Sequence, residues 1–340
     1  MGFSLGIVGL PNVGKTTIFN AITSICAEAS NYPFCTIEPN KGVVPVKDER
    51  LERIKEIIKV ESYLPTSITF IDIAGLVKGA NKGEGLGNKF LSHIREVDGI
   101  AHIVRCFEIP DIIHIEGDVN PIRDIEIIET ELALSDLEIL EKRKEKLQKS
   151  HTDDAKRQLK LILELEKILE NKINKNFIDV LPEEEKRFIK ELNLITLKPS
   201  FYIANVDEKE LEMQKYLPKL IQYAKDRDKN VCIICGKLEE ELGNLSEEEK
   251  KELLNAYNIE EDAIHQIIRY GYKMLNLITF FTTARRELKA WTVEKGTKAI
   301  KAAGKIHTDM ERGFIRAEVI HYEDLIKTGS EIKAREMGLY

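Results

Sequence analysis

The amino-acid sequence predicts an α/β protein: a mostly parallel sheet, interrupted by a helical hairpin and followed by a smaller α+β module. Three observations lead to this fold class. Short apolar segments alternate with helical patterns over the first hundred residues, which is typical of a parallel sheet covered by helices. A glycine-rich turn joins the first apolar segment to the first helix. Charged sequence with helical spacing of its apolar residues then interrupts the alternation between about residues 124 and 176.

The predicted strands are short apolar segments bounded by polar residues or glycine. The first covers residues 5–8 and leads into a helix at 15–23. Further strands are expected at 68–71, 100–104, 199–204 and 231–235. The last of these contains Cys232 and Cys235 as a C-x-x-C pair. Because the two-residue period of a strand points this pair to opposite faces, we expect no metal or redox site there.

The sequence from residue 124 to residue 176 is rich in Glu, Lys and Leu. Two runs with apolar residues at helical spacing flank a polar break at 150–154, which favours a projecting hairpin with a coiled-coil seam. The alternative is a single solvated helix packed on the main domain. From residue 278 the pattern changes again, and β-like segments at 288–293 and 314–320 indicate a small α+β module.

Composition and charge fit a cytoplasmic globular protein. The chain has 340 residues, 43% of them hydrophobic and 32% charged, which leaves room for two or three domains. No apolar run approaches the roughly 18 residues of a membrane span, so we expect no membrane partner. The net charge of −7 argues against extensive nucleic-acid coating. Five scattered cysteines indicate a reducing compartment.

The clearest motif is G-x-x-x-x-G-K-[ST] at residues 9–16, with a predicted strand before it and a helix after it. Glycine lets such a loop wrap a phosphate closely, and the following helix N-terminus adds positive potential. Lys15 is expected to reach the β- and γ-phosphates, and the Thr16 hydroxyl to bind Mg²⁺. The expected phosphate-binding residues are Asn12, Val13, Gly14, Lys15, Thr16 and Thr17. Lys15 is also the expected catalytic cation.

A second motif, D-x-x-G at residues 72–75, follows the predicted strand 68–71. The Asp72 carboxylate is expected to support Mg²⁺ through water, and the Gly75 amide to contact the γ-phosphate. Thr36, in the loop between the two motifs, is the candidate for another Mg²⁺ ligand, although loops also favour threonine as a simple turn residue.

Position 76 follows the second motif and is a leucine, which cannot orient an attacking water as the glutamine of Ras-type enzymes does. Slow intrinsic hydrolysis, or another water-positioning group, is therefore expected. Four glycines between residues 79 and 87 indicate a mobile loop directly after this position.

Base recognition is expected at Asn205, Val206 and Glu208, after the strand 199–204. Guanine recognition usually needs N-K-x-D, and here valine replaces the lysine and glutamate the aspartate. An asparagine amide oxygen can accept from the N6 amine of adenine, so the motif permits adenine. Asp207 remains an alternative reading carboxylate, which would make the protein a GTPase.

With these residues in hand, the chain resembles the Obg-like ATPases of the YchF subfamily, a group of P-loop enzymes. The resemblance covers essentially all 340 residues. It is carried by Gly9-Leu-Pro-Asn-Val-Gly-Lys-Thr, Asn31-Tyr-Pro-Phe-Cys-Thr-Ile-Glu-Pro-Asn40, Asp72-Ile-Ala-Gly-Leu-Val-Lys-Gly-Ala80, Gly83-Glu-Gly-Leu-Gly-Asn88, Ala204-Asn-Val-Asp-Glu208, Gly304-Lys-Ile-His-Thr-Asp309 and Arg312-Gly-Phe-Ile-Arg-Ala317.

The resemblance implies a Ras-like domain over residues 1–277, interrupted at 124–200 by a helical coiled-coil insertion. A β-grasp TGS module follows at 278–340. Relatives continue beyond the position of Tyr340 with strands that close the β-grasp sheet, so we expect this module to be incomplete and its nucleic-acid binding to be in doubt.

The resemblance also implies an ATPase that associates with the ribosome, through the large subunit or the whole particle. ATP is preferred through N-x-x-E, which maps onto Asn205 and Glu208. His114 matches a histidine considered for hydrolysis in the family, although a lone loop histidine is more often structural. Asn12 resembles the P-loop asparagine of potassium-stimulated relatives, so K⁺ joins Mg²⁺ as an expected ion. RNA is a further expected partner, through the TGS and coiled-coil surfaces.

We therefore predict a cytoplasmic, Mg²⁺-dependent ATPase that acts as a slow switch on the translation machinery. Two alternatives stay open. One is a GTPase of the same fold. The other is a nucleotide-gated ribosome-binding module whose hydrolysis is vestigial. Leu76 supports this second alternative.

Overall fold

The computed structural model describes residues 3–28, 37–38, 40–73, 88–171, 176–242, 245, 248–249, 252, 263–284 and 287–340. Its contacts divide the chain into two compact units. One unit comprises Met1–Ser4, Asn20–Phe70 and Gly243–Tyr340, and the other comprises Leu5–Phe19 and Ile71–Leu242. We call the first the peripheral unit and the second the nucleotide unit.

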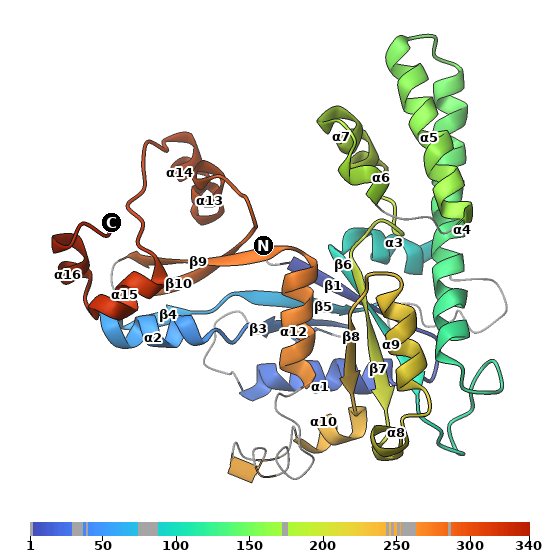
Figure 1. The fold of residues 1–340 in the computed structure, drawn as a ribbon, viewed down its shortest axis with the longest axis horizontal. Helices are drawn as coiled ribbons and strands as arrows, with labels where there is room; N and C mark the ends of the chain where they lie inside the picture. Colours follow the sequence, from blue (N-terminus) through green and yellow to red (C-terminus); the bar gives the residue numbers. More distant parts are fainter. Residues whose placement is uncertain are drawn as a thin grey trace. The chain divides into compact units, whose positions relative to one another are not determined.

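The main sheet has seven strands in the order β2-β3-β5-β1-β6-β7-β8 (Figure 1). Its strands are β1 (Phe3–Val8), β2 (Ile37–Glu38), β3 (Lys41–Pro45), β5 (Ser67–Asp72), β6 (Gly99–Cys106), β7 (Ser200–Val206) and β8 (Val231–Ile234). Strands β1, β6, β7 and β8 pair in parallel, while β2 and β3 pair antiparallel. Because β1 has β5 on one side and β6 on the other, the loop after β1 lies where connections diverge. Open α/β sheets bind their ligands at such a point.

Strands β6 and β7 are buried along nearly their whole length. All eight residues of β6 are buried, as are the last six of β7. Strands covered on both faces show continuous apolar runs of this kind rather than alternation. The expected strands at 68–71 and 100–104 are confirmed within β5 and β6, although β5 alternates between buried and partly buried residues. Cys232 lies in β8 and Cys235 directly follows that strand, and both are buried.

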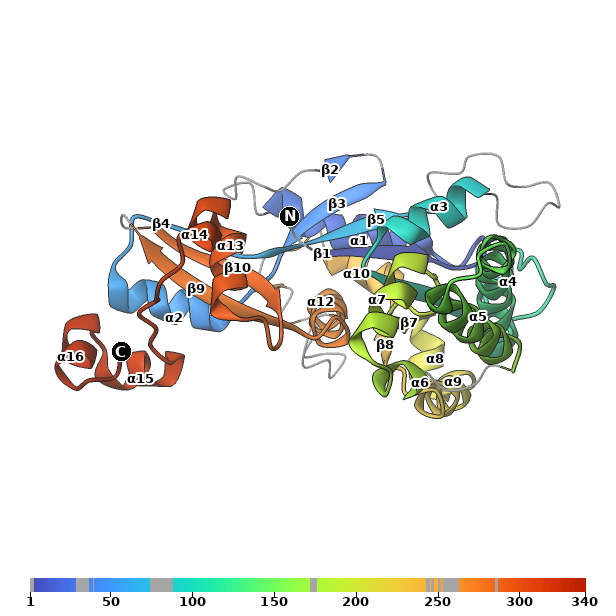
Figure 2. The same ribbon diagram turned by 90° about the horizontal axis from the view of Figure 1, so that it is seen from above.

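The nucleotide unit contains eight further described helices, some beside the sheet and others in a projection from it (Figures 1 and 2). They are α3 (Asn88–Glu96), α4 (Pro121–Gln148), α5 (Asp153–Asn171), α6 (Asn176–Asp179), α7 (Glu183–Leu192), α8 (Glu208–Met213), α9 (Leu217–Lys225) and α10 (Gly236–Leu242). Helix α1 (Lys15–Glu28) begins in this unit and is longer than the helix expected at 15–23.

The expected hairpin consists of α4 and α5, which lie side by side (Figure 1). The break between them follows from local chemistry: the Thr152 hydroxyl accepts the Ala155 N–H at 3.2 Å, and Asp153 and Asp154 occupy the first turn of α5. Acidic residues there complement the helix dipole.

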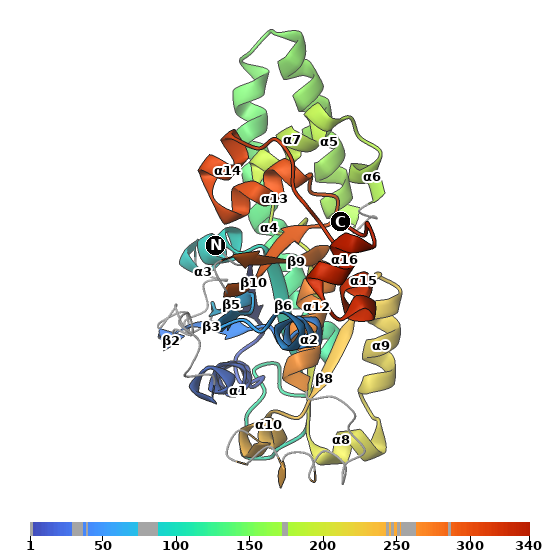
Figure 3. The ribbon, with the colours of Figure 1, turned by 90° about the vertical axis from the view of Figure 1, so that its left-hand side faces the viewer.

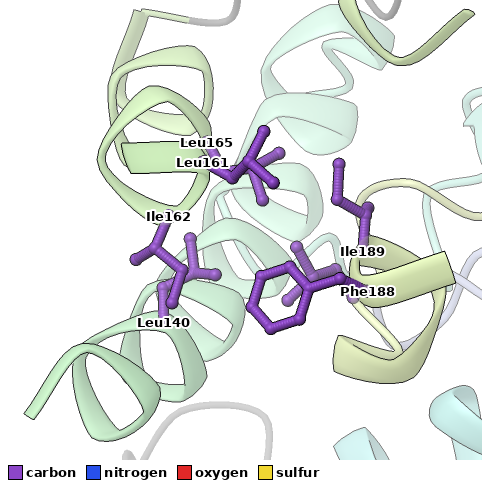
Figure 4. Packing of buried hydrophobic residues seen from close by; sticks show 7 residues of the cluster. Leu140, Leu161, Ile162, Leu165, Phe188 and Ile189 are labelled. Atoms are coloured by element: carbon purple, nitrogen blue, oxygen red, sulfur yellow. The ribbon is translucent and has the colours of Figure 1, made fainter. Parts of the chain in front are cut away.

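A third helix, α7, completes the core of the hairpin, which the sequence pattern did not indicate. Leu140 of α4 packs with Leu161, Ile162 and Leu165 of α5, and with Phe188 and Ile189 of α7 (Figure 4). The middle of α4 is bonded to the segment after α7, because the carboxylate of Asp136 accepts the backbone N–H groups of Ile195 and Thr196. The hairpin is thus more than a two-helix seam.

The peripheral unit contains a three-stranded sheet in the order β4-β10-β9, formed by β4 (Ser62–Leu64), β9 (Leu277–Ala284) and β10 (Glu287–Glu294). Strand β10 runs antiparallel to β9 and parallel to β4. The early segment 62–64 therefore belongs to the same sheet as the C-terminal residues. The division at residue 277 stays a prediction.

Helices cover both faces of this small sheet (Figure 3). Helices α2 (Glu49–Ile58) and α15 (Tyr322–Thr328) lie on one face, and α13 (Ala299–Ile306) and α14 (Thr308–Arg312) on the other. Leu51 and Ile54 of α2 share a buried cluster with Leu288 and Ala290 of β10 and with Leu325 of α15. The unit also contains α12 (Ala263–Met274) and α16 (Glu331–Glu336).

The β-like segment expected at 314–320 was wrong. These residues form neither a strand nor a helix, and Ile315 and Val319 are largely exposed. Alternating apolar residues are compatible with an extended backbone, but a strand also needs a neighbour with which to pair. None of the described helices is both long enough and apolar enough to span a bilayer.

Candidate functional site

The glycine-rich turn connects β1 to α1, and its backbone geometry requires glycine at two points. A Cβ on Gly9 would lie 2.5 Å from the Ile103 carbonyl oxygen of the neighbouring strand. Gly14 has φ of +90°, and a Cβ there would lie far inside contact distance of the Asn205 side chain. The loop is therefore packed closely against β6 and against the end of β7.

Lys15 begins α1, and its ammonium group lies over this loop. Its Nζ donates to the carbonyl oxygens of Gly9 at 3.1 Å and of Leu10 at 2.6 Å. Burial lowers the pKa of Lys15 to about 8, while the negative charge of Asp72 opposes that shift. A partly desolvated cation at a helix N-terminus is suited to a phosphate group, which the backbone N–H groups also favour.

The expected metal ligands can be placed in part. Asp72 is buried at the end of β5, and Thr16 is exposed in the first turn of α1. A carboxylate and a hydroxyl are hard oxygen donors, which fit Mg²⁺ completed by phosphates and water. Thr36, Gly75 and Leu76 lie outside the described residues.

Asn205 is the second-last residue of β7, and its side chain joins two backbone segments. Its Nδ2 donates to the Val13 carbonyl oxygen at 2.9 Å, and its Oδ1 accepts the Gly236 N–H at 3.2 Å. Asn205 is only 5% exposed, so these bonds are shielded from water. The residue expected to read the base thus also clamps the phosphate loop to the start of α10. Its contact with a base stays a prediction.

Gly236 is a site residue that sequence reasoning missed. It opens α10 immediately after β8, and a Cβ there would lie 3.2 Å from the Asn205 Oδ1. The available sequence feature was a glycine directly after the last strand of a parallel sheet, at the edge where ligands bind.

The residues after Asn205 divide into one that is buried, one that caps a helix and one that is exposed. Val206 is buried in β7. The Asp207 carboxylate accepts the Glu210 N–H at 2.9 Å, so Asp207 is the N-cap of α8. Glu208 is exposed in the first turn of that helix. Of the two carboxylates that could face a base, Asp207 already has a structural partner.

His114 lies in the loop between β6 and α4, where it is buried. Its Nε2 lies 2.8 Å from Asp124 Oδ2, and its Nδ1 accepts the Glu116 N–H at 3.1 Å. Both ring nitrogens are thus used inside the protein, and the proposed role in hydrolysis stays a prediction. The neighbouring Ile113 carbonyl accepts from Asn12 Nδ2 at 3.1 Å, which brings this loop to the phosphate loop.

Comparisons with known proteins agree with this geometry. Residues 4–142 match a family model described as 50S ribosome-binding GTPase, and residues 277–340 match YchF-GTPase_C, described as a protein of unknown function. The chain is 51% identical to the ribosome-binding ATPase YchF of Pasteurella multocida over 99% of this chain and 94% of that protein. It is 46% identical to the protein of that name from Bacillus subtilis, with the same coverage.

A solved structure is similar over the whole chain. It is the Schizosaccharomyces pombe YchF GTPase, which superposes with a TM-score of 0.90 at 40% sequence identity and covers 100% of this chain and 93% of that one. Full-length identity at this level, together with a P-loop at the divergence point of a parallel sheet, shows that the chain belongs to the YchF family of P-loop nucleotide-binding proteins.

Proposed function

We propose that this protein binds and hydrolyses ATP at its phosphate loop and associates with the ribosome. The observation that carries the proposal is the loop itself, with Lys15 over its carbonyl groups and Asn205 holding Val13. Relatives that match 99% of the chain are named ribosome-binding ATPases, and the family model over residues 4–142 is described by its 50S ribosome binding.

The chemistry of the site is positioning and neutralisation of charge. The amides of residues 12–17 hold the phosphates, and Lys15 offsets the negative charge that develops on them. Thr16, Thr36 and Asp72 are the residues that would hold Mg²⁺, which would supply positive charge to neutralise the phosphates. The Gly75 amide completes the contacts to the γ-phosphate.

The names of the relatives do not decide between ATP and GTP, because they include both ATPases and GTPases. The choice therefore rests on the residues at the end of β7 and directly after it. Asp207 caps α8, which supports Glu208 as the carboxylate that faces the base. Adenine has an acceptor at N1, so it can donate to this carboxylate only from its N6 amine. Guanine recognition uses two donor contacts to the carboxylate, from N1–H and from the exocyclic amine. Asn205 retains one N–H and one lone pair beyond its two bonds, and these can pair with N7 and N6 of adenine.

We further propose K⁺ as a second ion, and the large ribosomal subunit and RNA as partners. Because the Asn12 amide donates to Ile113, its Oδ1 faces away from that bond and could bind K⁺. Large-subunit binding follows the description of the family model. RNA contact by the TGS and coiled-coil surfaces extends this proposal to the hairpin α4–α5 and to residues 278–340.

Two other functions differ in measurable ways. A GTPase of the same fold would prefer GTP in a competition titration. A nucleotide-gated ribosome-binding module would bind ATP and the ribosome but show no turnover even on ribosomes. The leucine at position 76 motivates this second candidate, because it cannot orient water.

Co-sedimentation with ribosomes in ATP, in ADP and without nucleotide tests the proposal. We expect binding to ribosomes that depends on the nucleotide, and turnover of ATP that ribosomes increase. Lys15→Ala is the control, because it keeps the fold of the hairpin but loses the phosphate cation. The proposal would be contradicted if wild type and Lys15→Ala both sedimented with ribosomes to the same extent in ATP, in ADP and without nucleotide, and neither hydrolysed ATP.

A further inference from the structure

Helix α8 follows directly on the end of β7, so its placement decides where residues 206–208 lie (Figures 1 and 3). A helix of six residues is too short to be stable by itself. The structure describes all six of them, and Glu210 alone is buried. Since α8 has no buried apolar side chain among these residues, its position depends on polar contacts.

The Glu210 carboxylate supplies such contacts. Its Oε2 accepts the Lys215 N–H at 3.1 Å, and its Oε1 accepts the N–H groups of Tyr216 at 2.6 Å and of Leu217 at 2.9 Å. Glu210 is only 4% exposed. A carboxylate removed from water is costly unless donors of this kind satisfy it, so the buried Glu210 and the three N–H groups require one another.

These three donors lie at the start of α9. The residue before that helix, Tyr216, makes no side-chain hydrogen bond that would cap it. Glu210 therefore supplies, from α8, the acceptors and the negative charge that favour a helix N-terminus.

Helix α9 is itself fixed on the main sheet. Leu220 and Ala224 are buried, and the helix packs against β8. The Tyr223 ring lies beside the Tyr202 ring of β7, with their centroids 6.4 Å apart. The Glu210 carboxylate thus joins the short α8 to a firmly packed helix.

The backbone of Glu210 has a different role. Its N–H donates to the Asp207 carboxylate at 2.9 Å, and its carbonyl oxygen accepts the Gln214 N–H at 3.0 Å. Both bonds stay within residues 207–214, so they shape α8 without placing it. The bonds of the carboxylate, in contrast, reach across to α9.

We propose that Glu210 is a positioning residue for base recognition. By joining α8 to α9 it fixes residues 206–208 in the place where they meet the base, and so it sets the preference for ATP over GTP. This inference rests on the proposed binding of ATP with its base at residues 205–208. Glu210 is buried, so it acts through these residues rather than on the base itself.

The expected effect is on the choice of base. Glu210→Ala leaves three N–H groups at the start of α9 without their acceptor, so α8 shifts and residues 206–208 lose their alignment. Loss of one net hydrogen bond to the base predicts that the ratio of ATP affinity to GTP affinity falls about threefold to tenfold. Glu210→Gln keeps Oε1 as an acceptor for Tyr216 and Leu217, so this ratio should stay within about twofold of wild type.

Inorganic triphosphate is a probe that separates the base from the phosphate loop, because it carries the phosphates without a base. Lys15 and Asn205 bond to that loop, and neither belongs to α8. Glu210→Ala should therefore bind inorganic triphosphate as wild type does. A loss of triphosphate affinity equal to the loss of ATP affinity would show general damage to the site and would overturn the proposal.

Asp136 of α4 provides a matched control. It is also a buried carboxylate, and it accepts the N–H groups of Ile195 and Thr196 and the Arg95 guanidinium. Asp136→Ala should lower the melting temperature at least as much as Glu210→Ala, because it also removes several buried hydrogen bonds. It should not change the ratio of ATP affinity to GTP affinity. An equal change of that ratio in both variants would assign the effect to stability and reject positioning.

The experiment is calorimetric titration of the full chain, in Mg²⁺, with ATP, GTP and inorganic triphosphate in turn. The proteins are wild type, Glu210→Ala, Glu210→Gln and Asp136→Ala. An unchanged ratio of ATP affinity to GTP affinity in Glu210→Ala would overturn the proposal. A wild-type chain that does not bind ATP, or that prefers GTP, would instead reject the proposed function, so the two failures are distinguishable.

Glu210→Asp replaces Glu210→Ala should that protein fail to fold. It keeps a negative charge near α9, but its side chain is shorter by one methylene and cannot accept from all three N–H groups. Positioning predicts that the ratio of ATP affinity to GTP affinity falls in this variant also. A ratio equal to that of wild type would reject the positioning role.

Discussion

Gly14→Ala is the substitution that most sharply tests the packing of the phosphate loop. Gly14 has φ of +90°, and a Cβ there would overlap the Asn205 Nδ2. Gly296, in the turn after β10, is a matched control: its φ is +88°, but nothing lies within 4 Å of its Cβ position. Both substitutions carry the same backbone strain, and only one displaces a neighbour.

The magnitude follows from these contacts. A left-handed backbone costs an L-residue about 1–2 kcal/mol, which is the whole effect expected for Gly296→Ala. At Gly14 the methyl group must also push Asn205 away from Val13 and Gly236, and each lost bond is worth about 0.5–1.5 kcal/mol net. Gly14→Ala should therefore destabilise the protein by about 2–5 kcal/mol.

Urea denaturation followed by circular dichroism, paired with ATP titration, measures both consequences. We expect Gly14→Ala to unfold at lower urea than Gly296→Ala and to lose ATP binding, while Gly296→Ala binds as wild type. Equal destabilisation of the two variants, with ATP affinity intact in both, would refute the contact between Asn205 and the loop.

Three further outcomes are expected. Because burial lowers the pKa of Lys15 to about 8, its amine is neutral in the free protein above that pH, so ATP affinity should fall as pH rises through this value. Titrations with ATP over a series of pH values measure this fall, and an affinity that does not change with pH would contradict it. Leu51→Ala should cost about 2–5 kcal/mol, because Leu51 is buried in the core beneath β10, and the fluorescence of the single tryptophan in that strand reports the loss. Asp207→Ala should lower the free energy of unfolding by about 1 kcal/mol, because it removes a helix cap, and should not change the ratio of ATP affinity to GTP affinity. Glu208→Ala should change that ratio. The reverse pattern would indicate that Asp207 reads the base.

The sequence was most informative where local pattern decides structure. The short apolar segments inside β5 and β6 predict strands, and the continuous apolar run in β6 also predicts that this strand is buried on both faces. The spacing of glycine and lysine at residues 9–16 likewise predicts the turn after β1, since the backbone there admits few residue types.

Contacts between distant segments were not predictable in this way. The pairing of β4 with β10 joins residues more than two hundred positions apart, and nothing in either short strand specifies its partner. The packing of α7 against the hairpin was not predictable for a similar reason, because an amphipathic pattern does not specify which surface its apolar face covers. The segment 314–320 has a strand-like pattern without a strand, which shows that pattern alone does not supply a neighbour.

The candidate site shows the same division. The residue types at Lys15, Asp72 and Asn205 indicate a phosphate site, but the sequence does not say that Asn205 also clamps the loop through Val13 and Gly236. That contact depends on the order of strands in the sheet.

Steady-state turnover of ATP and GTP tests the central claim most directly. The full chain is assayed with each nucleotide, with and without ribosomes, beside Lys15→Ala. We predict that ATP is hydrolysed in preference to GTP, that ribosomes increase the rate, and that Lys15→Ala abolishes it because the loop loses the cation that spans the phosphates. Preference for GTP, or undiminished turnover in Lys15→Ala, would contradict the assignment of this site as an ATPase.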